Sequence, residues 1–244
     1  MNYGGFYYPQ IKVNMDDMAY TMYDTLLQLP LFQGMSKDEL SDIIERVRLD
    51  FQKIDAGETF FSQGDVCDSL VFVLSGEVEA ETIASYGKLS FVERYKRAMI
   101  IEPYSLFGMQ PRFKSTYRAL GTVSLLVIDK QYIYSVLFHY EVFRINLLNL
   151  LCNRAEQLYD KVWGISAQEL EGRLINFVHS LCTTIHGPKI LRVRMEDLAC
   201  LLDDTRLNVS NVLNKWRKEN LIAMCRKEFI FYDIEKLLSI RKLI

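Results

Sequence analysis

The chain has 244 residues, of which 50% are hydrophobic and 25% are charged, and its formal net charge is −2. The length favours two domains, and a hydrophobic share this large excludes an intrinsically disordered chain. Because no stretch approaches about 18 uncharged apolar residues and residues 1–10 lack a basic and apolar leader, we expect a cytoplasmic protein without membrane segments.

Charge and cysteine content narrow the function classes further. Residues 188–244 carry 12 lysines and arginines against 8 acidic residues, whereas the rest of the chain carries 17 against 23. A basic C-terminal segment is typical of a module that binds a polyanion. The five cysteines are widely spaced and never form a C-x-x-C pair, so we expect neither a disulfide framework nor a zinc site.

The N-terminal part is expected to be an extension followed by a first helix. Residues 1–30 are rich in tyrosine and methionine without a clear period, although residues 16–29 are compatible with a short helix. Ser36 and Glu39 then have the spacing of a capping box, and apolar residues continue at helical spacing. This pattern predicts an amphipathic helix that ends near Arg48.

Short apolar runs separated by glycines dominate residues 51–128. The runs are rich in β-branched and aromatic residues, and short strands with frequent turns are typical of an all-β sandwich or roll. We therefore expect a β-rich domain over residues 31–140. The predicted strands are Thr59–Phe61, Leu70–Leu74, Val78–Ile83, Leu89–Val92, Met99–Ile101 and Val123–Ile128.

A long helix is expected from Glu141 onwards, because no proline or glycine occurs between Asp129 and Trp163. Such a helix would carry an apolar stripe longer than one small domain can cover. The near-heptad spacing favours self-association of two helices over an ordinary core helix, and we expect a dimerisation helix over residues 141–165. The stripe consists of Val142, Ile145, Leu148, Leu151, Ala155, Leu158 and Val162.

A separate small domain is expected over residues 166–244. Gly164 and Gly172 bracket a predicted hinge, after which residues 173–183 show a second helical pattern. The run His186-Gly187-Pro188 ends this pattern.

Residues 195–214, MEDLACLLDDTRLNVSNVLN, have the pattern of a helix-turn-helix. Ala199 supplies the small residue at which the first helix faces the second. Asp203-Asp204-Thr205 supplies the turn, and Thr205 is a sound N-cap for the second helix. The apolar residues expected to seat the two helices are Leu198, Leu202, Val209 and Val212.

The outward face of the second helix carries side chains that hydrogen-bond base edges and phosphates. A surface helix that served only solubility would carry more glutamate and lysine. Residues 221–232 then predict a β-hairpin wing with a polar four-residue tip, Cys225-Arg226-Lys227-Glu228, that carries two basic residues. The candidate DNA-binding residues are Thr205, Arg206, Leu207, Asn208, Ser210, Asn211, Asn214, Lys215, Arg226 and Lys227.

Several short motifs, taken in chain order, resemble those of the Crp/Fnr family of transcription regulators. The resemblance implies an α+β chain with an N-terminal cyclic-nucleotide-binding-type β-roll as sensor domain, a long dimerisation helix and a C-terminal winged helix-turn-helix. It also implies a homodimer that binds double-stranded DNA and contacts RNA polymerase. The motifs are Leu31-Phe32, Gly57-Glu58, Gln63-Gly64-Asp65, the run from Asp68 to Gly76, Phe107-Gly108, Gly172-Arg173 and the helix-turn-helix with its wing.

The resemblance also identifies candidate effector residues. In family members that bind a cyclic nucleotide, Phe-Gly is followed by Glu and then by Arg-Ser or Arg-Thr, which hold the ribose and the phosphate. Here Met109 follows Phe107-Gly108 and no Arg-Ser or Arg-Thr comes after it, so cyclic AMP is not expected to bind. The candidate effector residues are Phe107, Gly108, Met109, Arg112, Arg118, Leu158 and Tyr159.

Other cofactors and activities can be addressed from the same residues. Residues 1–66 contain no cysteine, so the iron-sulfur cluster of the oxygen-sensing branch is not expected, and the identity or existence of an effector stays open. We find no Ser/His/Asp arrangement, phosphate loop or metal-ligand spacing, so we expect no catalytic and no metal-binding residues. One alternative to a DNA-binding regulator stays open, namely a ligand-gated regulatory subunit that acts through protein–protein contacts.

Overall fold

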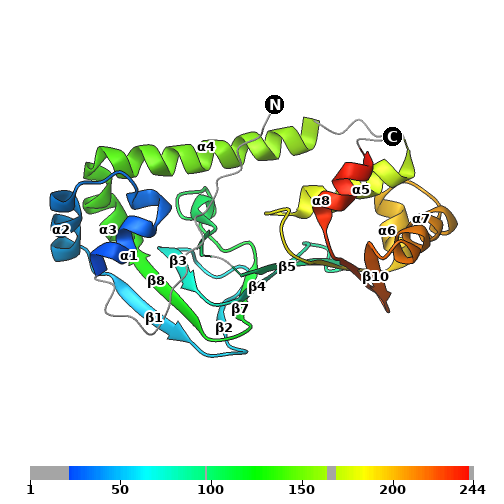
Figure 1. The fold of residues 1–244 in the computed structure, drawn as a ribbon, viewed down its shortest axis with the longest axis horizontal. Helices are drawn as coiled ribbons and strands as arrows, with labels where there is room; N and C mark the ends of the chain where they lie inside the picture. Colours follow the sequence, from blue (N-terminus) through cyan, green and yellow to red (C-terminus); the bar gives the residue numbers. More distant parts are fainter. Residues whose placement is uncertain (1–21, 97, 164–168, 242–244) are drawn as a thin grey trace. The chain divides into compact units, whose positions relative to one another are not determined.

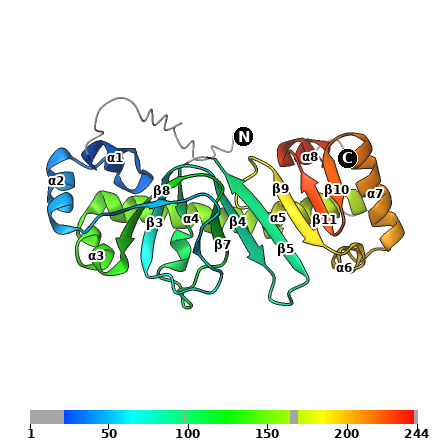
Figure 2. The ribbon, with the colours of Figure 1, turned by 90° about the horizontal axis from the view of Figure 1, so that it is seen from below.

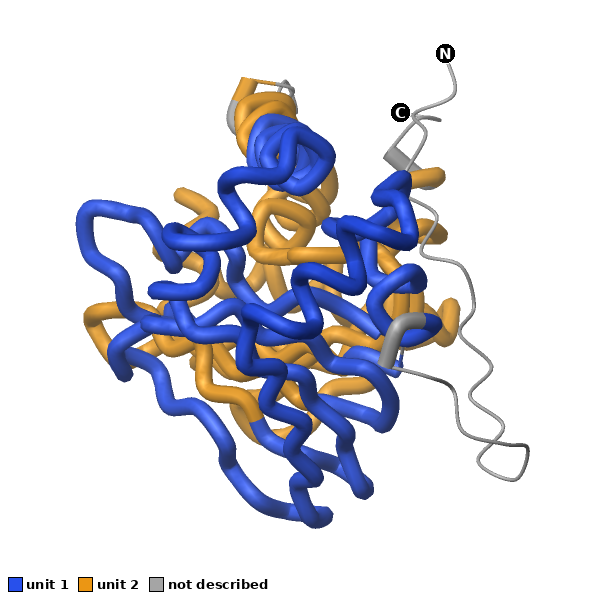
Figure 3. The backbone as a smooth tube through the Cα atoms, turned by 90° about the vertical axis from the view of Figure 1, so that its left-hand side faces the viewer, with its two compact units in different colours: residues 1–78, 95–114, 118–154 blue, residues 79–94, 115–117, 155–244 orange. Residues whose placement is uncertain are grey.

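A computed structural model describes residues 22–96, 98–163 and 169–241. These residues form two compact units, coloured blue and orange in Figure 3. Unit 1 contains the described residues up to Val78 together with Tyr95–Lys114 and Arg118–Arg154. Unit 2 contains Glu79–Arg94, Ser115–Tyr117 and the described residues from Ala155 on.

Unit 1 is built on a four-stranded antiparallel sheet with the strand order β1-β8-β3-β6, of which Figure 1 labels β1, β8 and β3. The strands of this unit are β1 (Asp50–Ile54), β2 (Thr59–Phe61), β3 (Ser69–Ser75), β6 (Met99–Ile101) and β8 (Val123–Asp129). Its helices are α1 (Met22–Gln28), α2 (Lys37–Arg46) and α3 (Lys130–Ser135), with 3-10 turns at η1 (Pro30–Phe32), η2 (Pro103–Ser105) and η3 (Leu137–His139).

The core of unit 1 joins the sheet to the helices through aromatic rings. Phe32 lies between Phe72 of β3 and Phe143 of the long helix α4 (Glu141–Trp163), with ring centroids 6.1 Å and 5.5 Å apart. All three rings are fully buried. Such tilted ring pairs add specific contacts to the burial of apolar area, so they fix the first turn of α4 to the sheet.

Unit 2 contains strands that are far apart in the sequence. Figure 2 shows β4, β5, β9, β11 and β10 side by side, which is the order of their hydrogen-bonded neighbours. The strands are β4 (Val78–Ile83), β5 (Leu89–Tyr95), β9 (Lys189–Val193), β10 (Ile222–Cys225) and β11 (Glu228–Phe231), together with the first half of β7 (Thr116–Ala119), whose second half belongs to unit 1. The helices are α5 (Leu170–Leu181), α6 (Met195–Leu201), α7 (Arg206–Lys218) and α8 (Ile234–Arg241).

The antiparallel pairing of β5 with β9 links the β4–β5 hairpin to the C-terminal helices. The pairing runs from Leu89 opposite Val193 to Glu93 opposite Lys189. At its end, the fully buried Lys189 ammonium lies 3.2 Å from the Glu93 carboxylate and donates to the His186 carbonyl at 2.7 Å. Glu93 is 5% exposed, so this ion pair is almost entirely removed from water.

Local sequence signals match the structure closely. The Ser36 hydroxyl accepts a hydrogen bond from the Glu39 backbone, and the Glu39 carboxylate accepts one from the Ser36 backbone, so the predicted capping box is confirmed. All six predicted strands are present, some extended by a few residues. The strands β1, β7 and β9 were not predicted, because their short and partly polar segments lack an apolar run.

The predicted hinge needs one correction. Gly172 lies buried inside α5, which begins at Leu170 and not at residue 173, while Gly164 lies outside the described residues. The glycine is helical because packing of α5 in the unit 2 core outweighs its weak helix propensity. Residues 1–21 of the predicted N-terminal extension also lie outside the described residues, and α1 forms its last part. In the part of the chain that is described, no helix is long and apolar enough to span a bilayer.

Candidate nucleic-acid interface

One carboxylate fixes the turn between α6 and α7. Asp204 accepts hydrogen bonds from the Asn208 side-chain amide and from the Thr205 backbone, both at 2.8 Å, and pairs with Arg173 of α5 at 2.6 Å. The bonds from Asn208 and Thr205, together with the Arg173 guanidinium, hold the pKa of Asp204 below its ordinary value. Asp204 is therefore ionised at neutral pH and ties the start of α7 to α5.

The predicted N-cap and the small residue of the first helix are both confirmed. The Thr205 hydroxyl accepts a hydrogen bond from the Asn208 backbone at 3.2 Å and satisfies one of the free N–H groups of the first turn. Ala199 is buried, and its carbonyl accepts a bond from the Asp204 backbone at 3.0 Å. A larger side chain at Ala199 would separate α6 from the turn.

The inner face of α7 is held by three fully buried side chains: Val209, Leu213 and Trp216. The Trp216 indole N–H donates to the Glu171 carboxylate of α5 at 2.7 Å, which satisfies its polar atom. Val212, which was predicted to seat the helix, is half-buried and packs against the same core. The helix is therefore held by Leu213 and Trp216, which continue the face of Val209 at helical spacing.

The opposite face of α7 projects into solvent. Successive helical residues are about 100° apart, so Leu207, Asn211 and Lys218 lie directly opposite the buried stripe. All three are exposed, and the Leu207 side chain is 70% accessible. Leu207 is thus an apolar side chain among polar neighbours on the face of α7 that the fold leaves accessible.

Arg206, Ser210 and Asn214 lie on the flank of this face. Arg206 Nε is 3.0 Å from the Glu196 carboxylate of α6, and both side chains are more than 60% exposed. A surface pair of this kind contributes little stability, so the arginine can exchange partners readily. The Asn214 amide donates to the Ser210 hydroxyl at 3.2 Å, and both residues are half-buried.

Two further predicted contact residues, Lys215 and Asn208, are also engaged within the protein. Lys215 Nζ lies 2.9 Å from the Glu171 carboxylate, which raises the pKa of the lysine. The Asn208 amide is hydrogen-bonded to Asp204. These residues hold α7 in place. Sequence reasoning missed this role for Lys215 because Glu171 lies 44 residues away, whereas Asp204 is only four residues before Asn208.

The wing is a tight hairpin of β10 and β11. Cys225 pairs with Glu228, so the turn consists of Arg226 and Lys227 alone and is narrower than the predicted four-residue tip. The Val193 backbone of β9 donates to the Lys227 carbonyl at 3.0 Å and fixes the turn. Among the described residues, Arg226, Lys227 and Lys218 form no ion pair, so their charges are available to a polyanion.

The residues of the predicted dimer stripe lie on two sides of α4. Val142 and Leu151 are half-buried, and the side chain of Val162 lies outside the described residues. Phe143 and Leu147, which were not part of the predicted stripe, are buried and hold the helix to unit 1. The solvent-exposed members of the stripe are Ile145, Leu148, Ala155 and Leu158, and the helix also exposes Cys152, Tyr159 and Trp163.

The candidate effector residues of unit 1 do not converge on one point. Met109 is fully exposed, and Phe107 packs on Phe138 at 5.4 Å with its outer part exposed. The Arg112 guanidinium donates to the Gly64 carbonyl at 2.7 Å, and that of Arg118 donates to the Gly57 carbonyl at 3.0 Å. Both arginines thus brace separate loops. Gly108 is exposed beside Phe107, while Leu158 and Tyr159 lie on the part of α4 assigned to unit 2.

A buried carboxylate near these residues is satisfied by the protein itself. Glu102 is 4% exposed and accepts hydrogen bonds from the Ser105 hydroxyl at 3.0 Å and the Lys114 backbone at 2.7 Å. The Glu102 carboxylate therefore joins the two ends of the segment between Glu102 and Lys114. Across the described ranges, no three His, Cys, Asp or Glu side chains are grouped in a way that suits a metal ion.

Comparison with known proteins gives a family match for a segment in each half of the chain. The family described as a cyclic nucleotide-binding domain matches residues 51–140, and the family described as a Crp-like helix-turn-helix domain matches residues 172–240. The chain is 22% identical over 190 residues to the global nitrogen regulator of Synechocystis, covering 75% of this chain and 84% of the relative.

Two solved structures have the same fold. The catabolite activator protein of Thermus thermophilus matches with 20% identity and a TM-score of 0.50, covering 87% of this chain and 98% of that structure. A regulator from Eubacterium rectale, described as of the Crp/Fnr family, matches with 18% identity and a TM-score of 0.51, covering 88% and 98%.

Proposed function

Since the chain belongs to the Crp/Fnr family, whose members are DNA-binding transcription regulators and not enzymes, we propose that it acts as a homodimer that binds a specific operator through α7. The observation that carries this proposal is the division of α7 into two faces. Val209, Leu213 and Trp216 seat the helix, whereas Leu207 and Asn211 project outward without a role in the fold. A rigid helix that presents exposed polar and apolar side chains suits the major groove.

Three side chains are proposed to read bases. Arg206 can place its guanidinium fork on the O6 and N7 atoms of guanine once it leaves Glu196, and Asn211 can pair with adenine through its amide. Leu207 is proposed to contact the 5-methyl group of thymine, the one apolar group that a base pair presents in the major groove. The operator half-site should therefore contain guanine and thymine close together.

Phosphate contacts are proposed for the basic residues around this face. Lys218 at the end of α7 and Arg226 and Lys227 in the wing are exposed and carry charges that no acidic group neutralises among the described residues. Lys215 is bound to Glu171, so its proposed share in phosphate binding is smaller. These contacts position the protein on the duplex without selecting a sequence.

The homodimer is proposed to form along α4. Ile145, Leu148, Cys152, Ala155 and Tyr159 are exposed and follow one another at alternating steps of three and four residues. This is the spacing of a heptad seam, which buries its apolar side chains against a second helix. A two-fold axis along α4 would present two copies of α7, which must lie about 34 Å apart to enter successive major grooves.

The sensor domain is proposed to work without cyclic AMP. Met109 stands where a ribose-binding carboxylate would be expected, and Arg112 and Arg118 are bound to backbone carbonyls of separate loops. The residues present therefore do not fit a cyclic nucleotide, and the effector, if there is one, has a different chemistry. Contact with RNA polymerase is proposed from family membership alone.

Selection of bound sequences from a random pool of duplex DNA tests the proposed function. We expect the full-length protein to enrich an inverted repeat whose half-sites are centred one helical turn apart. Enrichment of a single asymmetric site would contradict the homodimer. No enrichment at all, with binding that is insensitive to salt, would favour a regulatory subunit that acts on other proteins, because only phosphate contacts give a steep salt dependence.

A further inference from the structure

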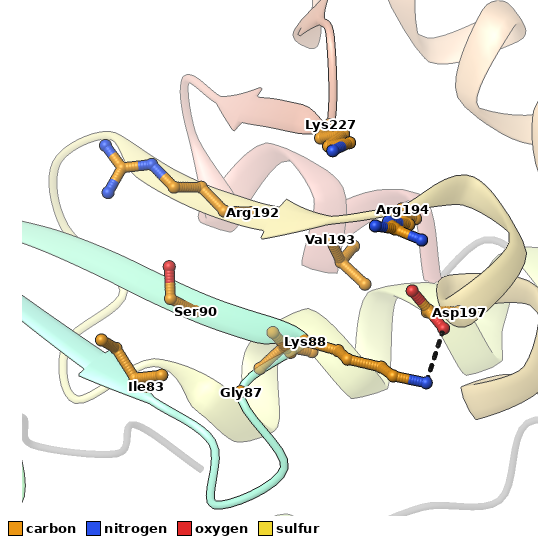
Figure 4. Close-up of a pocket in the computed structure, with 10 residues that line it drawn as sticks. Ile83, Gly87, Lys88, Ser90, Arg192, Val193, Arg194, Asp197 and Lys227 are labelled. Atoms are coloured by element: carbon orange, nitrogen blue, oxygen red, sulfur yellow. Dashed lines mark ion pairs between the residues drawn. The ribbon is translucent and has the colours of Figure 1, made fainter.

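A groove of about 390 Å³ opens at the ends of β5 and β9, entirely within unit 2 (Figure 4). Three segments form it: the β4–β5 turn with Lys88, the end of β9 with Arg192 and Arg194, and the wing turn with Lys227. Asp197 in the first turn of α6 is the one carboxylate among the lining residues. Basic side chains from separate parts of the sequence thus meet at one place.

The charges in this groove are only partly neutralised. Arg192 is bound on both sides, by Glu228 at 2.9 Å and by Glu81 at 2.7 Å. Lys88 lies 3.9 Å from Asp197 with its side chain 66% exposed, which is a weak and replaceable pair. Arg194 and Lys227 form no ion pair with any described residue. Among the lining residues, two unpaired cations, Arg194 and Lys227, and the loosely paired Lys88 are therefore set against one carboxylate, Asp197, and the groove favours an anion.

The groove shares the wing residue Lys227 with the candidate nucleic-acid interface. Glu196 lies two residues after Arg194 in the chain and pairs with Arg206 at the start of α7. The wing turn is fixed to β9 by the hydrogen bond from Val193 to the Lys227 carbonyl. An anion that runs past the N-terminal end of α7 towards the wing would therefore pass the groove.

We propose that this groove binds phosphate, and specifically a backbone phosphate of the DNA duplex held by α7. Lys88 is the informative residue, because it lies inside the sequence matched by the cyclic nucleotide-binding domain and outside the helix-turn-helix. The pairing of the adjacent Leu89 with Val193 fixes its backbone beside the wing. The β4–β5 turn thereby becomes a third element that contacts DNA, after α7 and the wing. This inference rests on the proposed function.

The salt dependence of DNA binding tests this assignment in the full-length protein. Affinity falls as salt rises, and each lost phosphate contact makes the slope of log K against log salt less steep by about 0.9. Between 50 and 200 mM salt, the fold-loss of affinity of Lys88→Ala should therefore be roughly 3.5 times smaller than that of wild type. The reduction should be equal on operator and random duplexes, and Lys88→Arg should retain the wild-type slope. A wild-type slope in Lys88→Ala on both duplexes would overturn the DNA assignment.

A matched control separates a local contact from a change in net charge. Lys96 is an exposed lysine in unit 1 with a similarly loose pair, 3.6 Å from Glu77, so Lys96→Ala removes the same charge elsewhere. We expect Lys96→Ala to leave the slope unchanged. An equal reduction in both variants would assign the effect to net charge and overturn the proposal. The thermal unfolding temperatures of both variants are compared with that of wild type, and equal values show that neither substitution disturbs the fold.

Two further outcomes identify the source of the phosphate and the step that fails. Calorimetry with inorganic pyrophosphate tests for a small phosphate ligand. If wild type binds pyrophosphate, Lys88→Ala does not, and both proteins show the same salt dependence of DNA binding, the groove serves a small phosphate compound. Its proposed role in DNA binding is then wrong. If the wild-type protein itself binds no DNA, the proposed function fails as a whole. Steep wild-type binding with an unaltered Lys88→Ala variant rejects the groove alone.

Discussion

The basic residues of the β-roll loop and those around α7 make opposite use of the same charge. Arg112 and Arg118 in unit 1 donate to the carbonyls of Gly64 and Gly57 and so complete loops of their own domain. Arg226 and Lys227 in unit 2 stand on a tight turn with no acidic partner among the described residues. A cation therefore indicates a ligand site when its donors are free or held only by a loose, exposed ion pair, and not when they complete a loop of the same domain.

The largest expected effect is on stability, and it concerns the residues that hold α7 in the fold rather than those proposed to contact bases. Trp216 is fully buried and donates to Glu171, so Trp216→Ala should lower the free energy of unfolding of unit 2 by about 3–5 kcal/mol, through the cavity that it leaves. Urea denaturation monitored by circular dichroism measures the change. Trp163, the other tryptophan, is 73% exposed, and Trp163→Ala should cost less than about 1 kcal/mol.

A pair of arginine substitutions tests the comparison directly. Arg206→Ala should weaken binding to the selected operator by about 1–3 kcal/mol, the usual contribution of one bidentate base contact, and should affect random DNA much less. Arg118→Ala should leave operator affinity unchanged, because its guanidinium is bound to Gly57. Fluorescence anisotropy with both duplexes measures these changes. Equal losses on operator and random DNA in Arg206→Ala would reduce its role to a phosphate contact.

A smaller effect is expected from the methyl group proposed to meet Leu207. Replacing the contacted thymine by deoxyuracil removes one methyl group, worth about 0.8 kcal/mol or roughly fourfold in affinity. The Leu207→Ala variant should lose this sensitivity while it still binds the operator. Scanning each thymine of the half-site with deoxyuracil identifies the position. Equal responses of wild type and variant at every thymine would rule out the contact.

The smallest expected effect is a dependence of stability on acid pH. Because the pKa of Asp204 is lower in the folded protein, the ionised group stabilises the fold above its ordinary pKa, and this contribution is lost as pH falls through the lowered value. As pH falls below about 4, the unfolding temperature should therefore decline less steeply in Asp204→Asn than in wild type. Parallel curves for the two proteins would show that the bonds to Asn208 and Arg173 do not contribute in solution.

Features that depend on neighbouring residues were predictable from the sequence. The capping box at Ser36 and the N-cap at Thr205 are local, since each is formed by residues three apart, and the wing hairpin was predicted although its turn is tighter than expected. Period and turn chemistry therefore identified α2, α4, α7 and most strands. The family motifs added the roles that these elements play.

Features that depend on distant partners were not predictable. Glu171 lies 44 residues before Lys215, so nothing near the lysine indicates that its charge is already bound. Gly172 is a glycine, a residue type that favours a hinge, but tertiary packing buries it inside the helix α5. The pairing of β5 with β9 joins segments about a hundred residues apart, and neither strand differs from an ordinary one in its sequence.

The buried pair of Lys189 and Glu93 has a consequence for anyone who dissects this protein. A C-terminal fragment that starts at α5 would lack β5, so β9 would become an open edge with unpaired backbone groups, prone to association with other copies. The same cut would remove Glu93, the counter-ion of Lys189, together with the strand that pairs with β9 at that point. Fragments intended to remain monomeric in solution should carry residues 79–94 as well.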